Sequence, residues 1–137
     1  MSTFPLKIVT PDGLLFDGEA EELVVRTTTG DMGILAGHIN CVAPLGMGQA
    51  TVVVEGKKRT AACIGGMVSI LNGRVTLVPT TFEWAENINR DRARRSSERA
   101  KAILENKSSS DMDLRLASAR LKRALIRSSV ADHYHNI

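Results

Sequence analysis

The chain changes its sequence period once, near Trp84, and this change limits the folds that it can adopt. Residues 5–78 hold short runs of β-branched and apolar residues separated by turn signals, a pattern typical of an antiparallel sandwich or barrel. Residues 86–107 contain no Gly or Pro and are rich in Ala, Arg, Glu and Lys, which favours a helix. The expected fold class is therefore β + α, with an N-terminal antiparallel β-sandwich over 1–85 and a C-terminal two-helix antiparallel hairpin over 86–137.

The clearest turn signal in the first half is Asn72-Gly73. It lies between Val68–Leu71 and Arg74–Val78, two runs of strand-forming residues. An Asn-Gly pair in this position favours a type I′ turn, because both central residues must adopt positive φ. A further turn containing Glu55-Gly56 is expected between two similar runs, so tight turns connect neighbouring strands of the predicted sandwich.

The predicted hairpin has only a narrow apolar stripe on each helix. A break at Ser108–Ser110 separates the helices, and Ser110 with Asp113 fits a capping-box-like start for the second helix. At helical spacing, the first helix presents Ala93, Ser97, Ala100 and Leu104, and the second presents Leu114, Ala117, Leu121 and Leu125. Because these stripes bury little apolar area, they stabilise the hairpin weakly, and we expect it to act as a conformational switch.

Charge is divided unevenly between the two halves. Residues 1–86 carry six Lys/Arg and nine Asp/Glu, a balance of −3, whereas residues 87–137 carry twelve and six, a balance of +6. This asymmetry predicts two modules with different partners. Phosphates, nucleic acid, anionic lipid and an acidic protein surface would each suit the positive half.

The cysteines and histidines give no sign of a metal site. Cys41 and Cys63 lie in unrelated apolar segments and are interpreted as reduced, small hydrophobic residues of a cytosolic protein. His38 is expected to fix its loop by a hydrogen bond, and His133 with His135 would supply only two metal ligands. The sequence shows neither a signal peptide nor a run of about 20 apolar residues, so a soluble, cytoplasmic protein is expected.

The most informative segment is Gly30–His38, which reads Gly-Asp-Met-Gly-Ile-Leu-Ala-Gly-His. It resembles the Gly-Asp-x-Gly-Ile-Leu-x-Gly-His signature of ATP synthase epsilon subunits, with Ala36 where the family often has Pro. The resemblance extends over nearly the whole chain, and its other parts are Phe16-Asp17-Gly18, Gly65-Gly66, Asn72–Leu77 and the break at Ser108–Ser110. On these residues the chain is identified as a member of the epsilon-subunit family of bacterial F-type, proton-translocating ATP synthases.

The resemblance implies a set of partners and a place in the cell. The sandwich of such a subunit binds the central gamma shaft and sits on the polar loops of the membrane c-ring, and Asp31, Met32, Gly33 and His38 match the c-ring loop. The helices either fold back or extend beside gamma, where basic side chains near acidic segments of the beta (and alpha) subunits obstruct ATP hydrolysis. The resemblance thus implies a peripheral protein at the cytoplasmic face of the bacterial membrane, held there only through the complex.

Some bacterial members of this family bind one regulatory ATP, which stabilises the folded hairpin, through an Ile/Leu-Asp-x-x-Arg-Ala motif. The matching run here is Ile88–Ala93, in which Asn89 replaces the acid. Arginines spaced seven apart on the first helix and four apart on the second each share a helix face, and two such faces could clamp a triphosphate. The residues implied for ATP are Glu83, Ile88, Asn89, Arg92, Arg99, Arg123 and Arg127. No cofactor is required, and the alternative is that these arginines form a solvated face or meet the beta subunit.

Two rival functions stay open at this point. A nucleic-acid-binding module would use the basic hairpin to neutralise phosphates, but the positive half has no aromatic residue except Tyr134 and no known nucleic-acid-binding motif. An enzyme would need a Walker pattern, an acid pair or a nucleophile with its base, and none is apparent. The sequence therefore favours a non-catalytic regulatory subunit, for which ATP would be a signal and not a substrate.

Overall fold

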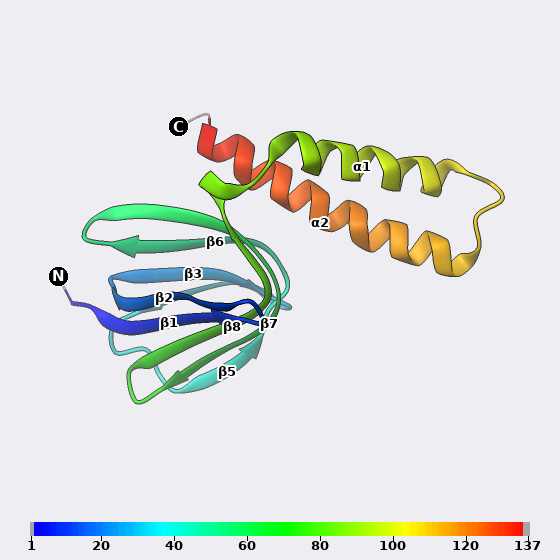
Figure 1. Cartoon of the computed structure of the whole chain (residues 1–137). Coiled ribbons are helices and arrows are strands. Elements are labelled where there is room, and N and C mark those ends of the chain that lie inside the picture. The colour runs from blue at the N-terminus through cyan, green and yellow to red at the C-terminus, as the bar shows by residue number, and fades with distance from the viewer. Residues whose placement is uncertain (1, 136–137) are drawn as a thin grey trace. The chain divides into compact units, whose positions relative to one another are not determined.

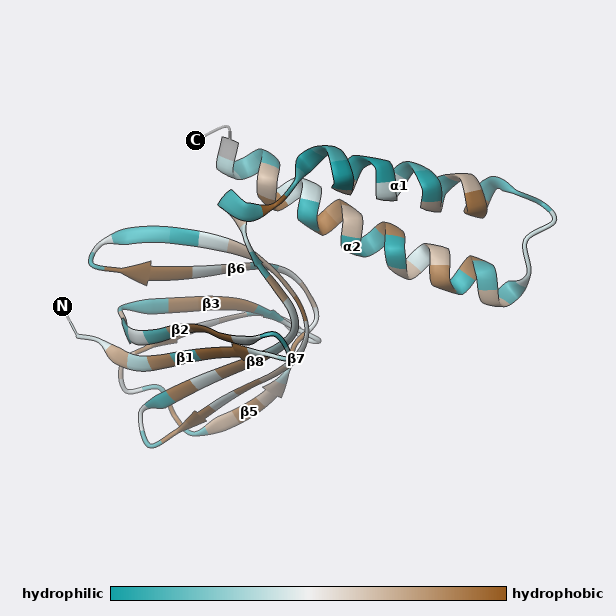
Figure 2. Cartoon of the chain, in the orientation of Figure 1, coloured by the Kyte–Doolittle hydropathy of each residue, from teal (hydrophilic) through white to brown (hydrophobic). Residues whose placement is uncertain are grey.

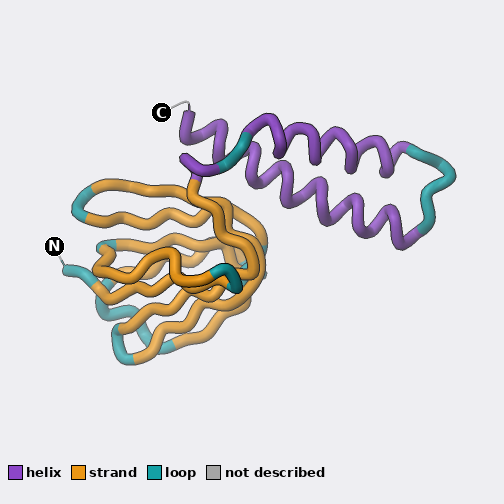
Figure 3. Tube along the Cα trace, viewed as in Figure 1, coloured by secondary structure: helices purple, strands orange, loops and turns teal. Residues whose placement is uncertain are grey.

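The computed structural model describes residues 2–135. The chain folds into two compact units, Met1–Trp84 and Ala85–Ile137, which are described in turn. Figure 3 shows that the first unit consists of strands joined by short turns and that the second consists of helices. The β + α architecture expected from the sequence is confirmed.

One continuous sheet forms the first unit and folds over on itself as a sandwich (Figure 1). Its strands are β1 (Phe4–Thr10), β2 (Gly13–Ala20), β3 (Glu22–Thr27), β4 (Gly30–Leu35), β5 (Cys41–Pro44), β6 (Met47–Val54), β7 (Lys57–Leu71) and β8 (Arg74–Trp84). Their order is β2-β1-β8-β7-β6-β3-β4, with β5 paired to β7. Within residues 2–84 the pairs are antiparallel except β1 with β8, the first and last strands, which run parallel.

The long strand β7 changes partner at Gly65-Gly66. Its first half pairs with β6 as far as Ile64, and its second half pairs with β5 from Met67 onward. The amide of Gly65 donates to the carbonyl of Gly46 at 2.9 Å, and the carbonyl of Gly66 accepts from the amide of Leu45 at 2.8 Å. Both glycines have positive φ, 67° and 95°, which side chains disfavour. The two layers of the sandwich therefore share one strand that bends at these glycines.

Strand alternation builds the core of the sandwich. In β1, Phe4, Leu6 and Ile8 are buried while Pro5 and Lys7 are exposed, as expected for successive side chains on opposite faces. Figure 2 shows the same pattern as brown segments recurring along the strands, whereas α1 is mostly teal. The apolar core of the chain thus lies largely in the sandwich.

Two turns of the sandwich follow the sequence prediction. At Asn72-Gly73 both residues have positive φ, 51° and 81°, as the type I′ prediction requires, and Leu71 pairs with Arg74 across the turn. Glu55-Gly56 adopts the same kind of conformation, with φ of 51° and 77° between β6 and β7. The prediction of tight hairpin turns at both places is confirmed.

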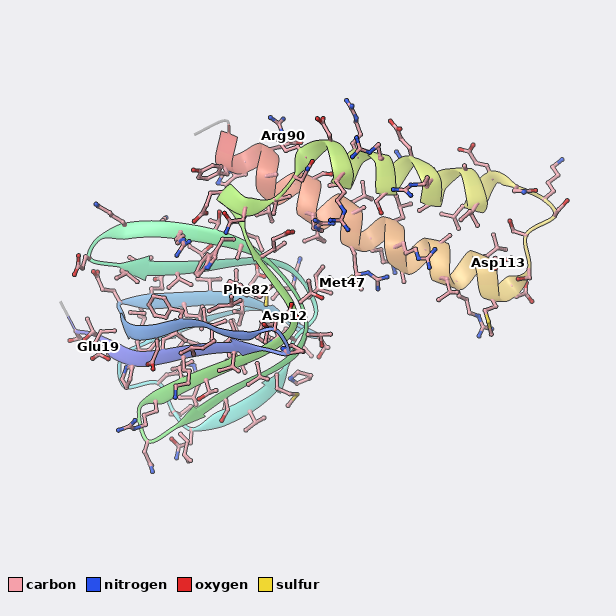
Figure 4. All side chains as sticks on the ribbon, viewed as in Figure 1. Asp12, Glu19, Met47, Phe82, Arg90 and Asp113 are labelled. Atoms are coloured by element: carbon pink, nitrogen blue, oxygen red, sulfur yellow. The ribbon has the colours of Figure 1, made fainter. Side chains whose placement is uncertain are left out.

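The end of β8 is fixed by aromatic contacts. The rings of Phe82 and Trp84 meet edge to face with their centroids 4.9 Å apart, and Figure 4 labels Phe82. The guanidinium carbon of Arg59 lies 3.7 Å from the centroid of the Trp84 ring, a cation–π contact. These contacts hold the last residue of the sandwich unit, after which the helical unit begins.

The second unit holds a short 3-10 helix, Ala85–Asn87, followed by α1 (Arg90–Glu105) and α2 (Asp111–His135). The regular helix begins later than the sequence suggested, because Asn89 caps it: its side-chain oxygen accepts from the amide of Arg92 at 2.9 Å. The predicted break is present, and Ser110 caps α2 by accepting from the amide of Asp113 at 3.1 Å. Figure 4 shows Arg90 and Asp113 at opposite ends of this hairpin.

The seam between the helices consists of even smaller side chains than predicted. On α1, Ala93, Ser97 and Ala100 are buried as expected, whereas Leu104 is exposed. On α2, the predicted stripe of Leu114, Ala117, Leu121 and Leu125 was wrong in part: Ala117 is buried and Leu114 and Leu121 are half-buried, but 47% of the Leu125 surface is exposed. The buried α2 positions are Ala117, Ala124, Val130 and Ala131. Alanines spaced seven apart let the backbones approach closely, which turns the larger leucines to the flank.

Among the described residues, no helix is both long enough and apolar enough to cross a membrane.

We predict that Gly66→Ala strongly destabilises the sandwich. A Cβ at this position would lie 2.1 Å from the carbonyl oxygen of Val78 and 2.7 Å from the Cα of Pro79, and φ is positive as well. The expected loss in the free energy of unfolding is about 3 kcal/mol or more. Denaturant unfolding followed by Trp84 fluorescence measures it.

Gly33→Ala is the matched control, because a Cβ there meets no atom within 4 Å and its φ is not positive. Its stability should stay within about 0.5 kcal/mol of the parent. Equal stability of the Gly66→Ala and Gly33→Ala variants would show that β7 and β8 tolerate a side chain at the bend.

Candidate functional site

The β3–β4 hairpin is held rigid at its tip by Thr27. The buried hydroxyl of Thr27 donates to the carbonyl of Gly30 at 2.7 Å and accepts from the amide of Thr29 at 3.2 Å. The amide of Thr28 donates to the carbonyl of Pro44 at 3.2 Å, which ties the turn to β5. The residues that follow in β4 therefore start from a fixed backbone.

The prediction of a loop over the four c-ring residues was wrong in part, because Asp31, Met32 and Gly33 lie in strand β4 and only His38 follows it. Asp31 and Gly33 occupy outward-facing positions of β4 and are exposed. Met32 points inward and packs against the core, so its side chain supports the strand. His38 is half-buried, and its Nδ1 donates to the carbonyl of Ile39 at 2.9 Å, which confirms the predicted loop-fixing hydrogen bond. Of these four residues, Asp31 and Gly33 are the exposed ones, and Gly33 presents bare backbone.

Sequence reasoning missed Arg26, which pairs with Asp31 across the hairpin. The two residues are direct partners in the register of β3 and β4, and the Arg26 Nε lies 3.6 Å from the Asp31 Oδ1. Only the strand register reveals this pair, because several turn and strand residues separate the two along the chain. The Asp31 carboxylate, predicted for the c-ring contact, therefore lies beside the guanidinium group of Arg26.

The flanks of the α1 stripe carry different arginine pairs. Successive helix residues turn by about 100°, so Arg92 and Arg99 lie on one flank of the buried positions and Arg90 and Arg94 on the other. Arg90 donates from Nε at 3.0 Å and from a terminal nitrogen at 2.7 Å to Oδ1 of Asp132 on α2. This ion pair therefore places Arg90, Arg94 and Asp132 on one side of the hairpin.

The four arginines predicted for ATP share the opposite side of the hairpin. On α2, Asp132 lies on one flank of the buried alanines, and Arg123 and Arg127 lie on the other. The Arg90–Asp132 pair also sets the antiparallel register, so that Arg99, nine residues along α1, is level with Arg123, nine residues back along α2. The structure thus places Arg92 and Arg99 on the same side as Arg123 and Arg127.

An open pocket of about 700 Å³ lies at the start of α1, on the side of the Arg90–Asp132 pair. Its lining residues are Ile88, Asn89, Arg90, Asp91, Arg94, Ser128 and Asp132. Of the residues predicted for ATP, it includes Ile88 and Asn89 but none of the four arginines. Glu83 belongs to β8 of the sandwich unit. Ile88 is buried, and the Asn89 oxygen is engaged in capping, so this carboxamide presents its NH₂ group as a donor.

The thiols show no functional environment. Cys41 and Cys63 are free, as expected, and burial raises the pKa of the Cys63 thiol to about 12. A thiol with so high a pKa stays protonated and unreactive at neutral pH. Within residues 2–135, no group of three His, Cys, Asp or Glu side chains is placed to hold a metal ion.

Comparisons with known proteins agree with this two-unit organisation. Residues 3–85 match the family model of the ATP synthase delta/epsilon chain beta-sandwich domain, and residues 86–132 match that of the delta/epsilon chain long alpha-helix domain. The chain is 38% identical over 133 residues to the ATP synthase epsilon chain of Shouchella clausii, covering 97% of this chain and 98% of that one. It is 41% identical over 131 residues to the epsilon chain of Bacillus velezensis, covering 96% and 98%.

A solved structure shares the fold. A chain in the cryo-EM structure of the Euglena gracilis mitochondrial ATP synthase matches with a TM-score of 0.83 and 23% identity, covering 94% of this chain and 81% of that one. A beta-sandwich domain followed by a helical domain is the organisation that the two family models describe for the ATP synthase delta/epsilon chain. On the family models and the full-length relatives, the chain belongs to the ATP synthase delta/epsilon chain family.

Proposed function

We propose that the chain is a non-catalytic epsilon subunit of the ATP synthase rotor, in which the sandwich couples gamma to the c-ring and the hairpin inhibits ATP hydrolysis. The observation that carries this proposal is the contrast between the two units. The sandwich has a full apolar core, whereas the hairpin is closed by a seam of alanines. Each buried methyl group contributes only about 0.8 kcal/mol, so the hairpin can rearrange at small cost while the sandwich stays folded.

The outer face of the β5–β7–β8 layer suits gamma as a partner. The register places Pro44, Met67 and Val78 in one row across the three strands, and all three are exposed. Val42, with 65% of its surface exposed, and Leu71 extend the same face. Exposed apolar side chains that gather in this way are typical of protein–protein contacts. The row therefore supports docking of the sandwich on the gamma shaft.

We predict that Met67→Glu weakens binding of the full-length subunit to the gamma-containing head complex by about tenfold or more, because an unpaired carboxylate would be buried in the contact. Surface plasmon resonance measures the affinity of each subunit variant for immobilised head complex that lacks this subunit. Gln49→Glu, at an exposed position of β6, is the control and should bind like the parent. Parent-like affinity of Met67→Glu, or an equal loss in the control, would contradict the assignment of this face.

The other end of the rotor contact is proposed to lie at the β3–β4 hairpin. Asp31 and Gly33 are exposed there on a backbone fixed by Thr27, and they match the family's c-ring loop. In this proposal the subunit is peripheral, at the cytoplasmic face of the bacterial membrane, and reaches the membrane only through the ring. The acidic balance of residues 1–86 keeps this unit electrostatically distinct from the basic hairpin.

The hairpin is proposed to inhibit hydrolysis when it extends beside gamma. Its twelve basic residues against six acidic ones suit the acidic segments of beta (and alpha) that the resemblance implies. The leucines on the flanks of α2, among them the exposed Leu116 and Leu125, give the extended form apolar contacts that the alanine seam does not use. Both features favour a hairpin that can leave its folded arrangement and bind the beta (and alpha) subunits instead.

We predict that truncation after Glu86 speeds ATP hydrolysis by the head complex, because the inhibitory helices are removed while the sandwich still docks. Steady-state hydrolysis by reconstituted head complex measures the rate. A full-length variant with Arg92→Gln, Arg99→Gln and Arg123→Gln keeps the helices but loses three cations, and it should be partly released from inhibition. Equal rates for the truncated and the full-length subunit would rule out an inhibitory role.

Regulatory ATP binding to the folded hairpin completes the proposal. Arg92 and Arg99 share a side of the hairpin with Arg123 and Arg127, which is the arrangement that a triphosphate clamp needs. Asn89 keeps the capping function that Asp would also supply, so the helix start is preserved despite the missing charge. The proposal assigns the triphosphate to this arginine side, and the adenine or ribose to the start of α1 near Ile88 and Asn89.

We predict heat release when the full-length subunit is titrated calorimetrically with MgATP, and about tenfold weaker binding for Arg99→Gln, because one charged hydrogen-bond donor to phosphate is lost. Arg94→Gln is the matched control on the opposite flank of α1 and should bind like the parent. Asn89→Asp, which restores the family's acid, should bind more tightly. Absence of heat at millimolar MgATP for both the parent and Asn89→Asp would refute the site. Weaker MgATP binding in Arg94→Gln alone, with parent-like binding in Arg99→Gln, would place the site on the other side of the hairpin.

A further inference from the structure

The exposed end of the β3–β4 hairpin carries a cross-strand ion pair. The side chains of Arg26 and Asp31 are 50% and 66% exposed, and their Nε and Oδ1 atoms lie 3.6 Å apart. An isolated surface pair usually contributes little to stability, because two long side chains lose freedom when they hold one geometry. Such a pair contributes more where the surrounding structure has already restricted the rotamers of its side chains.

Gly46 and Gly48 restrict Arg26 in this way. The amide of Gly46 donates to the carbonyl of Arg26 at 2.9 Å. A Cβ on Gly48 would lie 2.7 Å from the Cβ of Arg26 and 3.1 Å from its Cγ, distances that only a glycine permits. A Cβ on Gly46 would lie 3.5 Å from the same Cγ. The aliphatic part of Arg26 therefore lies against two glycines at the start of β6, which limits its rotamers.

Asp31 is restricted from the other strand. It follows Gly30 directly, and the carbonyl of Gly30 accepts from the buried Thr27 hydroxyl. Arg26 precedes Thr27 directly, so one buried hydroxyl fixes the backbone next to both members of the pair. The fold thus meets part of the entropy cost of forming the Arg26–Asp31 pair, because it fixes the backbone next to both residues and limits the rotamers of Arg26.

We propose that Arg26 is a positioning residue of the β3–β4 hairpin. It holds the Asp31 carboxylate in place, so that the surface proposed to meet the c-ring carries a charge pair and not a lone anion. This inference rests on the proposed contact of Asp31 with the c-ring. The partner that such a surface fits is a polar loop that offers a hydrogen-bond donor to Asp31 and an acceptor to Arg26. A purely basic segment fits it less well, because Arg26 would repel it.

The test uses complete ATP synthase reconstituted in lipid vesicles, with variants of this chain as the only change. The readout is ATP-driven proton pumping divided by ATP hydrolysis, which reports coupling through the ring contact and not the amount of folded enzyme. Asp31→Asn and Arg26→Gln are each expected to lower this ratio about twofold to fivefold. The double variant should be no worse than either single one, because the two residues act as a unit.

Two further variants sharpen the result. Arg26→Lys keeps the charge but loses the planar fork, so it should recover part of the coupling. Lys57→Gln removes an exposed cation at the β6–β7 turn and should leave coupling unchanged. Denaturation midpoints of the isolated variants should match the parent, as expected for surface changes.

The outcomes separate this inference from the proposed function. Loss of coupling in Asp31→Asn together with parent-like coupling in Arg26→Gln would overturn the positioning role and leave the c-ring contact standing. Losses that multiply in the double variant would also overturn it, because the residues would then act independently. Parent-like coupling in Asp31→Asn would remove the c-ring contact itself, and the inference with it.

Discussion

The structure depends on a close backbone approach at Gly66. There β7 passes so near to Val78 and Pro79 of β8 that no side chain fits, and there it leaves β6 for β5. This bend lets one strand serve both layers of the sandwich, so the buried faces of β1, β3 and β8 can meet in a single core. The exposed apolar row of β5–β7–β8 and the β3–β4 hairpin, the two surfaces proposed for docking, belong to the sandwich that this bend creates.

The two units differ in how they are stabilised, and this difference is the physical basis of the proposed regulation. Large apolar side chains such as Leu6, Ile8 and Leu77 fill the sandwich, whereas alanines close the hairpin. The Arg90–Asp132 pair adds only a half-exposed contact at the open end of the hairpin. In the function proposed above, this division keeps the sandwich rigid for transmitting torque, while the hairpin, proposed to respond to ATP or to the beta subunits, can rearrange.

Several contacts at the β3–β4 hairpin determine how charge is arranged on its exposed surface. Thr27 fixes the turn, Gly46 and Gly48 hold Arg26, and Arg26 faces Asp31. Each of these contacts is modest in energy, and together they define one arrangement of charge on an exposed surface. The hairpin arginines follow the same principle, because helical periodicity and the Arg90–Asp132 register determine which of them share a side.

The sequence by itself determined the fold class, the two units and the Asn72-Gly73 turn, since these depend on local period, turn chemistry and composition. The Asn at position 89 stood out only through the resemblance to a family whose motif has Asp there. It did not determine which α2 residues are buried: leucines were expected at the seam, but alanines occupy it, because packing distance between backbones decides which stripe faces inward. The Arg26–Asp31 pair and the parallel β1–β8 pairing likewise needed the tertiary structure. The register of β1 with β8 joins residues distant in the chain, and no local pattern specifies it. The register of the β3–β4 hairpin depends on its turn, which the sequence analysis did not assign.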